Sequence, residues 1–235
     1  MLHLARVPAV NTSARCPYDG RVTTSAFDAL QRYINSTASA DAALVDAVDT
    51  AEEFGIAVPD TATASLLTTL AALAAGGEKA SLVAVTPAAA VVGLHLLAGV
   101  APGSQLTAID PESEHQRHAR EALSAAGYPA STLRFLPSRP LEVMGRLAKG
   151  SYHLIYADVR ATDLAAMTQA AWPLLADGGV LVLADSLLDG LVGDESRSDR
   201  DTVAAREADQ ALADLEGAIV MRLPLGAGLT CITKR

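Results

Sequence analysis

The chain of 235 residues has little cysteine, few aromatic residues and no excess of basic charge. Cys16 and Cys231 lie at opposite ends of the sequence, so they suggest neither a disulfide framework nor a metal-binding pair, which fits a reducing compartment. The net charge is −9, whereas a non-specific nucleic-acid surface needs an excess of Lys and Arg. The sparse aromatic residues show no pattern for stacking on bases. Nucleic acid is therefore excluded as a partner.

Long apolar runs are also lacking. No stretch reaches the length of a membrane span, and the apolar run at the N-terminus is too short for a secretory signal. The sequence therefore predicts a cytoplasmic protein without a membrane partner. What the chain does have is a hydrophobic content of 50%, enough for one sizeable core.

Short apolar segments alternate with helical segments from residue 82 onward, which predicts a parallel sheet covered by helices on both faces. The expected strands are Leu82–Val85, Leu106–Asp110, Thr132–Leu136, His153–Asp158 and Val180–Asp185. The expected helices are Ala89–Leu97, Glu112–Ala126, Leu141–Lys149, Thr162–Leu175 and Thr202–Leu215. Gly178 and Gly179 are expected to form the turn into the fifth strand. The last strands, Ala218–Leu223 and Leu229–Thr233, flank a short Gly/Pro-rich connection and predict an antiparallel hairpin.

The N-terminal part has a different character. Residues 1–25 show no clear periodicity and read as a tail or arm, whereas Phe27–Asn35, Asp41–Phe54 and Thr61–Ala75 are expected helices. We therefore predict an arm and helix over residues 1–35 and a single α/β domain over residues 36–235.

The stretch from Leu82 to Asp110 carries the main functional signal. It predicts a strand, a turn, a helix and a second strand that ends on a carboxylate, which is the layout of a nucleotide-binding βαβ unit. The turn, Thr86–Ala90, lacks the glycines that let backbone approach a ligand, since none occurs between Gly77 and Gly93.

Five segments together resemble the S-adenosylmethionine-dependent O-methyltransferase family related to catechol O-methyltransferase, from about Ser36 to the C-terminus. They are AEEFGIAVPDTATASLLTTLAAL, QLTAIDPESEHQRHAREALSAAGY, YHLIYADV, AWPLLADGGVLVLADSLLDGLVGD and LPLGAGLTCITK. The resemblance implies a class I methyltransferase fold: a Rossmann-like three-layer sandwich around a seven-stranded, mostly parallel sheet with an antiparallel C-terminal hairpin. It also implies a homodimer, S-adenosylmethionine as cofactor, a small hydroxylated acceptor, and Mg²⁺ or another divalent cation beside that acceptor.

The resemblance also implies cofactor contacts. Asp110 corresponds to the acid that accepts hydrogen bonds from both ribose hydroxyls of the adenosyl group, with Pro111 against the ribose or adenine. Ser138 and Arg139 lie where the family contacts adenine. The remaining positions implied are Val58, Ala84, Val85, Thr86 and Asp158. The family's acid and glycine-rich turn after the first strand are replaced here by alanines, Thr86 and Pro87.

For catalysis, the resemblance implies that Asp158 is the central acid between cofactor and metal. Asp185 and Ser186 stand where the family has Asp-Asn as further metal ligands. Position 161, where mammalian members have a proton-accepting Lys, is Ala161, so we assign no general base. His115 and His118 lie three residues apart beside charged neighbours, and we expect a solvated helix face.

Two other readings remain open. The loss of the acid and glycines at 84–90, of Asn at 186 and of Lys at 161 favours a catalytically inactive relative that serves as a dimeric binding or regulatory module. A nicotinamide-dependent dehydrogenase shares the βαβ unit, but pyrophosphate needs close backbone approach at the turn. The expected C-terminal hairpin also speaks against a dehydrogenase.

Overall fold

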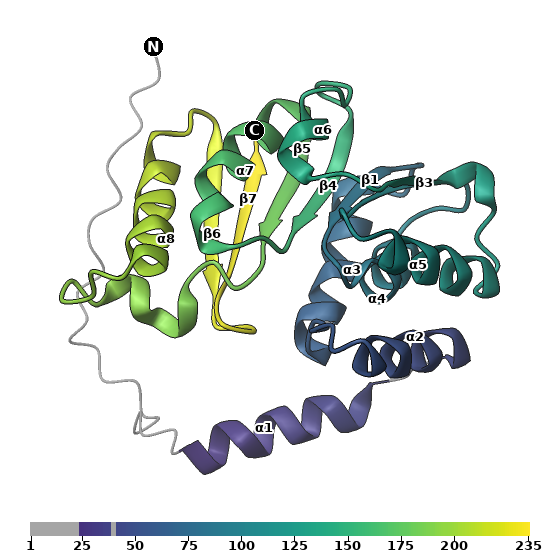
Figure 1. Cartoon of the computed structure of the whole chain (residues 1–235), viewed down its shortest axis with the longest axis horizontal. Helices are drawn as coiled ribbons and strands as arrows, with labels where there is room; N and C mark the ends of the chain where they lie inside the picture. The colour runs from purple at the N-terminus through teal and green to yellow at the C-terminus, as the bar shows by residue number, and fades with distance from the viewer. Residues whose placement is uncertain (1–23, 39–40) are drawn as a thin grey trace. The chain divides into compact units, whose positions relative to one another are not determined.

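The computed structural model describes residues 24–38 and 41–235. Contacts divide the chain into two units, residues 1–38 and 39–235, and each is described by itself. In the first unit, helix α1 (Thr24–Thr37) extends the expected helix Phe27–Asn35 at both ends. The arm expected before residue 24 lies outside the described residues. Everything below concerns the second unit (Figure 1).

The second unit is built on a seven-stranded sheet of order β3-β2-β1-β4-β5-β7-β6. Its strands are β1 (Ser81–Val85), β2 (Gln105–Ile109), β3 (Leu133–Leu136), β4 (Tyr152–Ala157), β5 (Leu175–Leu183), β6 (Ala218–Leu223) and β7 (Leu229–Lys234). The first five pair in parallel, whereas β7 runs antiparallel to both β5 and β6. The expected parallel sheet with a C-terminal antiparallel hairpin is confirmed.

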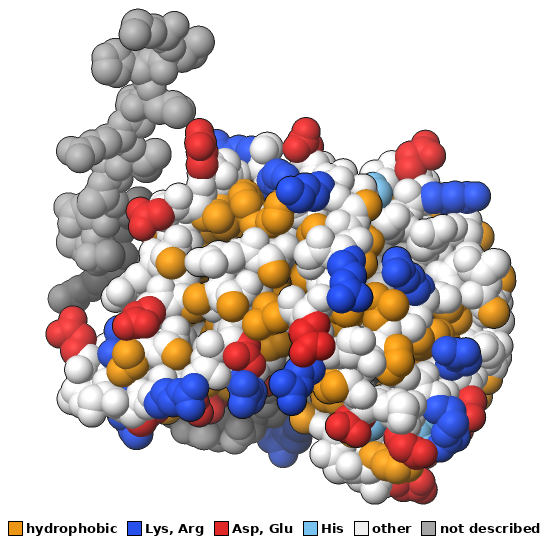
Figure 2. Space-filling view, turned by 45° about the horizontal axis from the view of Figure 1, so that its top comes forward, with side chains coloured by type: hydrophobic (Ala, Val, Ile, Leu, Met, Phe, Trp, Pro, Cys, Tyr) orange, Lys and Arg blue, Asp and Glu red, His pale blue; other side chains and the backbone are white. Residues whose placement is uncertain are grey.

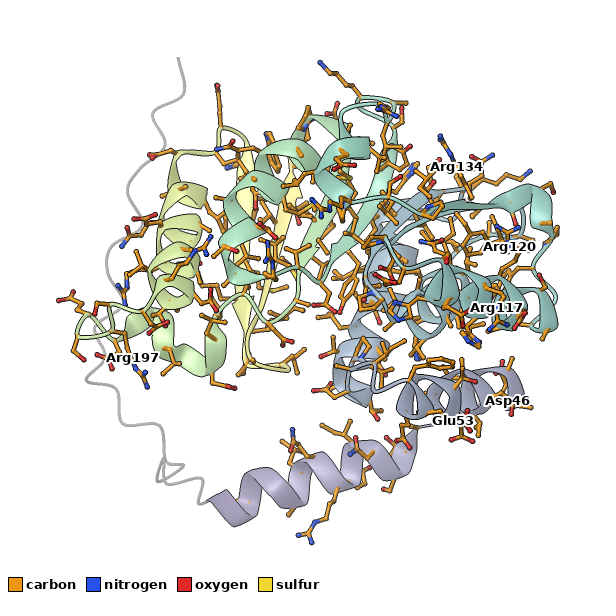
Figure 3. The ribbon with its side chains drawn as sticks, viewed as in Figure 1. Asp46, Glu53, Arg117, Arg120, Arg134 and Arg197 are labelled. Carbon is orange, nitrogen blue, oxygen red and sulfur yellow. The ribbon has the colours of Figure 1, made fainter. Side chains whose placement is uncertain are left out.

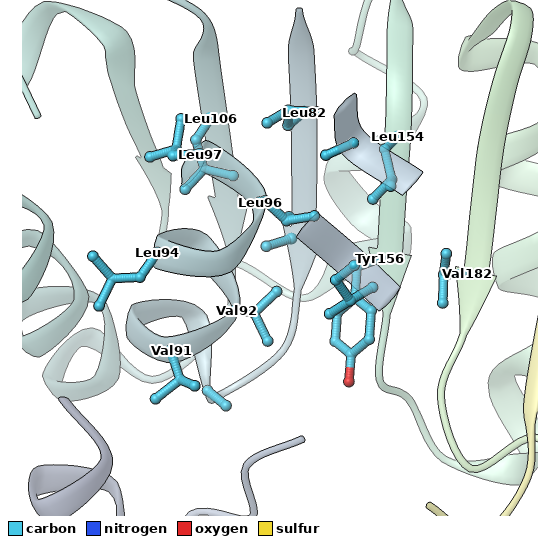
Figure 4. Close-up of a cluster of buried hydrophobic side chains, with 14 of the residues drawn as sticks. Leu82, Val91, Val92, Leu94, Leu96, Leu97, Leu106, Leu154, Tyr156 and Val182 are labelled. Carbon is cyan, nitrogen blue, oxygen red and sulfur yellow. The ribbon is translucent and has the colours of Figure 1, made fainter. Parts of the chain in front are cut away.

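Helices cover both faces of this sheet and complete the expected three-layer architecture (Figure 1). One face carries α3 (Thr61–Ala75), α4 (Ala89–Ala98) and α5 (Ser113–Ala125), with α2 (Ala42–Glu53) against α4 and α5. The other carries α6 (Pro140–Met144), α7 (Leu164–Ala171) and α8 (Arg200–Ala211). Figure 4 shows the first core, a buried cluster that includes side chains of α4 and Leu82, Leu154 and Val182 of the sheet. Burying one such Leu or Val stabilises the fold by about 1.5–3 kcal/mol.

Aspartate side chains fix where several helices begin. Asp41 accepts a hydrogen bond from the backbone N–H of Leu44 at 2.8 Å, and Asp60 accepts one from Thr63 at 2.7 Å. A carboxylate in this position satisfies a backbone donor that the helix leaves free, and its removal costs about 1 kcal/mol. The cap at Asp60 also fixes the start of α3, next to the cavity described below.

Four of the expected elements have wrong boundaries, and one of them is the helix expected over 202–215, which begins at Arg200 and ends at Ala211. The helix expected over 141–149 ends at Met144, because Gly145 and Arg146 close a tight turn on the preceding carbonyls. The helix expected over 162–175 is α7 flanked by short 3₁₀ turns, and Pro173 lies in the second of these turns. Strand β5 begins at Leu175 rather than Val180, because Leu175 already pairs with Tyr152 and the glycines form an irregularity within the strand.

Charged side chains of both signs lie on the surface. On the face shown in Figure 2, acidic and basic side chains are interspersed. Among the described residues, no helix is both long and apolar enough to cross a bilayer.

Helices α3 and α4 approach closely at Gly99, where a Cβ would lie 2.2 Å from the carbonyl oxygen of Thr68. We expect Gly99→Ala to lower the free energy of unfolding by about 1–3 kcal/mol, because the backbones must separate. Gly145→Ala is the matched control: φ there is −64° and nothing lies within 4 Å. It should leave stability unchanged or raise it by about 0.4–1 kcal/mol. Urea denaturation measures both, and equal stability of the two variants would contradict this packing.

Candidate functional site

The carboxyl ends of the parallel strands lie in register along one edge of the sheet. Val85 pairs with Ile109 on one side and with Ala157 on the other, and Ala157 pairs in turn with Leu183. The residues that follow these strand ends are Thr86, Asp110, Asp158 and, one position further on, Asp185. The strand order reverses between β1 and β4, which is where open α/β sheets bind ligands. Four of the expected site residues thus lie along the same edge of the sheet.

A cavity of about 170 Å³ opens between this edge, the start of α3 and the turn between β6 and β7. Of the residues expected to bind cofactor or metal, Val58, Asp158 and Asp185 line it. Three further polar residues, which the sequence reasoning did not assign to a site, also line it: Asp60, Thr63 and Tyr156.

Asp158 is held between β1 and the cavity. Its backbone N–H donates to the carbonyl of Val85 at 2.9 Å, and its Oδ2 accepts a hydrogen bond from the Thr86 hydroxyl at 3.2 Å. Burial raises the pKa of the Asp158 carboxyl, and the nearby Asp185 carboxylate raises it further, while the Thr86 hydrogen bond opposes the shift. The carboxyl is therefore a better proton acceptor than a solvated aspartate when it is ionised.

Tyr156 is buried and lines the same cavity. Burial raises its pKa far above the ordinary value, and the negative charges of Asp158, Asp185 and Asp60 act in the same direction. The phenol therefore stays neutral and can donate a hydrogen bond into the cavity, but it cannot act as a base. Its place in the apolar strand YHLIYA gave no sign of this role in the sequence.

The turn between β6 and β7 closes one side of the cavity. Its backbone N–H at Ala227 donates to Asp185 Oδ1 at 2.8 Å, and the N–H of Gly226 donates to Asp60 Oδ2 at 3.4 Å. Gly226 has φ of +55°, and a Cβ there would lie 2.7 Å from Asp185 Oδ1. Glycine is therefore needed at this position for both its backbone conformation and the close approach of the carboxylate.

Thr63, which lines the cavity, carries a buried hydroxyl without a partner in the described part of the chain. Thr63 is 4% exposed, and its Oγ1 has no hydrogen-bond partner among the described residues. A buried polar group without a partner costs about 1–3 kcal/mol, so a ligand or water partner is favoured. Nothing in the sequence pointed to this residue, because a threonine in the first turn of a helix is expected to belong to the helix cap.

The turn after β1 needs no glycine in its observed form. From Ala84 to Ala90 no residue has positive φ. The Thr86 hydroxyl accepts a hydrogen bond from the Ala88 N–H at 3.1 Å and donates to Asp158. Ala88 and Ala89 are 3% and 1% exposed, so their methyl groups pack inward. The absence of glycine therefore causes no backbone strain here.

At the end of β2, Asp110 is 4% exposed and already hydrogen-bonded. Its Oδ2 lies 2.6 Å from Nδ1 of His115, and its Oδ1 accepts from the Glu112 N–H at 3.1 Å. The backbone N–H groups of Asp110 and Ser138 both donate to the Leu136 carbonyl, at 3.4 and 2.9 Å. The structure thus brings Ser138 beside Asp110.

The remaining expected adenosine contacts, Pro111 and Arg139, are exposed near this strand end. The expectation that His115 and His118 face solvent is wrong. His115 turns back onto Asp110 because α5 begins directly after the strand, and the ring of His118 packs on Phe54 with centroids 4.5 Å apart.

The expected metal ligands do not come together as a set. Asp158 and Asp185 share the cavity, but Ser186 lines a separate pocket beside α8 and donates to Thr230 Oγ1 at 2.8 Å. Within residues 24–38 and 41–235, no group of three His, Cys, Asp or Glu side chains has a metal-binding arrangement. The donors present therefore do not fit the three-ligand site that the resemblance implies.

Comparison with known proteins identifies the family. Residues 64–186 match a family model described as a methyltransferase domain. A protein of Mycolicibacterium smegmatis, named provisionally as an O-methyltransferase, is 34% identical over 205 residues, which cover 87% of this chain and 96% of that protein. This chain belongs to the S-adenosylmethionine-dependent O-methyltransferase family.

Solved structures agree with this assignment. A Corynebacterium glutamicum protein is 55% identical, with a TM-score of 0.86 over 89% of this chain and 97% of that one. The O-methyltransferase TomG of Streptomyces achromogenes, solved with S-adenosylmethionine, is 21% identical with a TM-score of 0.76, over 88% and 96% of the two chains. At that identity TomG supports the fold alone.

The raised pKa of Asp158 predicts how stability depends on pH. The folded state favours the protonated form of the Asp158 carboxyl. Its contribution to the free energy of unfolding is therefore fully present below the unfolded-state pKa of about 3.9, and it is lost as pH rises through the higher pKa of the folded state. Asp158→Asn removes the buried charge and should raise the melting temperature at pH 7, with the gain vanishing as pH falls toward 4. Thermal melts across this range measure it.

Asp177→Asn, at an exposed position of β5, is the matched control and should shift the melting temperature little at any pH. If Asp158→Asn is less stable than the parent at pH 7, the conclusion that burial of the ionised Asp158 carboxylate is unfavourable for folding is wrong.

Proposed function

We propose that this chain transfers the methyl group of S-adenosylmethionine to a hydroxyl of a small acceptor. The supporting observation is the cavity that Asp158, Tyr156 and Thr63 line at the point where the strand order reverses. A cavity of about 170 Å³ is smaller than the roughly 300–1,000 Å³ typical of whole drug-sized ligand sites, so it suits one end of the cofactor together with a small acceptor.

The cofactor would extend along the carboxyl edge of the sheet. In this proposal Asp110 accepts hydrogen bonds from the ribose hydroxyls, and Pro111, Ser138 and Arg139 border the adenine. Val58, Ala84, Val85, Thr86 and Asp158 surround the methionine end, with Thr63 as an additional donor. When bound, the cofactor supplies the electrophilic methyl group, and the sheet edge keeps it beside the cavity.

The side chains of the cavity would act mainly by positioning. Asp158 accepts a hydrogen bond from the acceptor hydroxyl and so orients its oxygen, while Tyr156 donates one. Orientation of two reacting groups supplies a large part of the rate enhancement in such displacements. Asp60, Asp158 and Asp185 line the cavity without any Lys or Arg, which favours a neutral or cationic acceptor over an anionic one. Because the metal ligand set does not fit, we assign no step to a divalent cation.

The same proposal includes a homodimer and a cytoplasmic location. It also includes a domain that begins near residue 36 and an N-terminal arm that helps to select the acceptor. They follow from the resemblance and from the composition.

A second candidate is a catalytically inactive relative that binds its ligand or a partner without methyl transfer. Two observations favour it: the Ala88 N–H is satisfied by Thr86, and both oxygens of Asp110 already have partners within the chain. Groups that would contact a cofactor are thus internally satisfied.

Calorimetric titration separates these candidates. We expect the protein to bind S-adenosylhomocysteine, the demethylated product, with a micromolar dissociation constant. Asp110→Asn should weaken binding roughly tenfold or more, because the ribose loses a charged acceptor. Asp177→Asn, the same substitution at an exposed position, should have no effect.

Transfer of an isotope-labelled methyl group to a panel of small phenols and diols then tests catalysis. Product binding with methyl transfer supports the enzyme, and product binding without transfer to any acceptor favours the inactive module. Binding that is absent or millimolar would reject the proposed enzyme.

A further inference from the structure

We propose that His115 is a positioning residue for the cofactor: its Nδ1–H holds Asp110 in the orientation that receives the two ribose hydroxyls. This inference rests on the proposed function and deepens it. It assigns a role to a side chain that the sequence placed on a solvated helix face.

The contact between the two side chains is short and partly shielded from solvent. His115 Nδ1 lies 2.6 Å from Asp110 Oδ2, and the side chains are 21% and 6% exposed. An ionised carboxylate only accepts hydrogen bonds, so Nδ1 must carry the proton whether the imidazole is neutral or charged. Hydrogen bonds to ionised groups are stronger than neutral ones, and this bond therefore fixes the rotation of the carboxylate.

Each oxygen of Asp110 has one partner within the chain and keeps one acceptor site. A carboxylate has about four lone-pair sites, two on each oxygen. Here His115 uses one site on Oδ2, and the Glu112 N–H uses one on Oδ1. One acceptor site remains on each oxygen, which matches the two adjacent hydroxyls of a ribose. Without His115, Oδ2 would have no partner and the carboxylate could turn away from the ligand.

The surroundings of His115 explain why the ring can serve this role. It is the third residue of α5, so its side chain reaches back to the end of β2. The ring borders a small pocket of about 20 Å³ beside Pro87 and Ala88, which belong to the turn after β1. His115 therefore lies between the ribose acid and the turn that the methionine end would follow.

The neighbouring side chains Arg117 and His118 have other partners and do not bind Asp110. Arg117, which Figure 3 shows on α5, is paired with Glu114 and Glu121 at 3.2 and 3.0 Å. His118, one turn further along the helix, packs on Phe54 and lies in the same pocket as His115. His118 thus offers a matched control: a histidine on the same helix, of similar exposure, that makes no contact with Asp110.

The test is titration of the full chain and three variants with S-adenosylhomocysteine. We expect His115→Ala to raise the dissociation constant roughly tenfold, as found for residues that orient a binding group. His115→Asn should stay within about twofold of the parent, because its amide nitrogen can replace Nδ1 as donor. His118→Ala should also stay within about twofold, and melting temperatures of all variants are recorded alongside.

Rescue by Asn separates positioning from a merely structural role, since a packing defect would be shared by Ala and Asn. Equal binding by His115→Ala would overturn the inference, and tighter binding would overturn it and indicate that the imidazole occupies the place of the ribose. Equal weakening by Ala and Asn would overturn it as well. If the parent chain does not bind S-adenosylhomocysteine, the proposed function itself fails. This failure differs from a failure of the His115 inference, because it is seen with the parent chain alone and needs no variant.

Discussion

The site depends on the register of the parallel strands. Because β2, β1, β4 and β5 end at the same level, residues separated by up to 99 positions, from Thr86 to Asp185, come to lie along one edge. A shift of one residue in any of these strands would turn its terminal side chain to the opposite face of the sheet. The two hydrophobic cores that enclose the sheet therefore specify the positions of the polar groups as much as they stabilise the fold.

Concentrated negative charge is the second feature of this edge. Three carboxylates and a neutral phenol border one small cavity, and backbone N–H groups of the β6–β7 turn satisfy one oxygen of Asp185 and one of Asp60. The protein thus partly compensates two of the charges and leaves Asp158 with a single hydroxyl donor. This is an arrangement that a ligand with positive charge would stabilise, as expected where stability is given up for function.

The sequence predicted the architecture well and the site in part. Alternation of apolar strands with helices is a long-range signal, and it correctly indicated a parallel sheet with a terminal hairpin. It placed Asp110, Asp158 and Asp185 at strand ends. It failed at β5, where pairing of Leu175 with Tyr152 overrides the two glycines, and at His115, whose partner lies at the end of a strand rather than on its own helix face. Asp60 is bonded to a turn 166 residues away and lines a cavity together with it, which no local pattern reveals.

The turn after β1 has a consequence for the energetics of ligand binding. Glycine-rich turns reach their bound shape by giving up many accessible conformations, and that loss opposes association. Here alanines and Pro87 restrict the backbone, and Thr86 ties the turn to both Ala88 and Asp158. Most of this ordering takes place when the polypeptide folds, so the turn is preorganised, and a ligand bound beside it would cost the turn little conformational entropy.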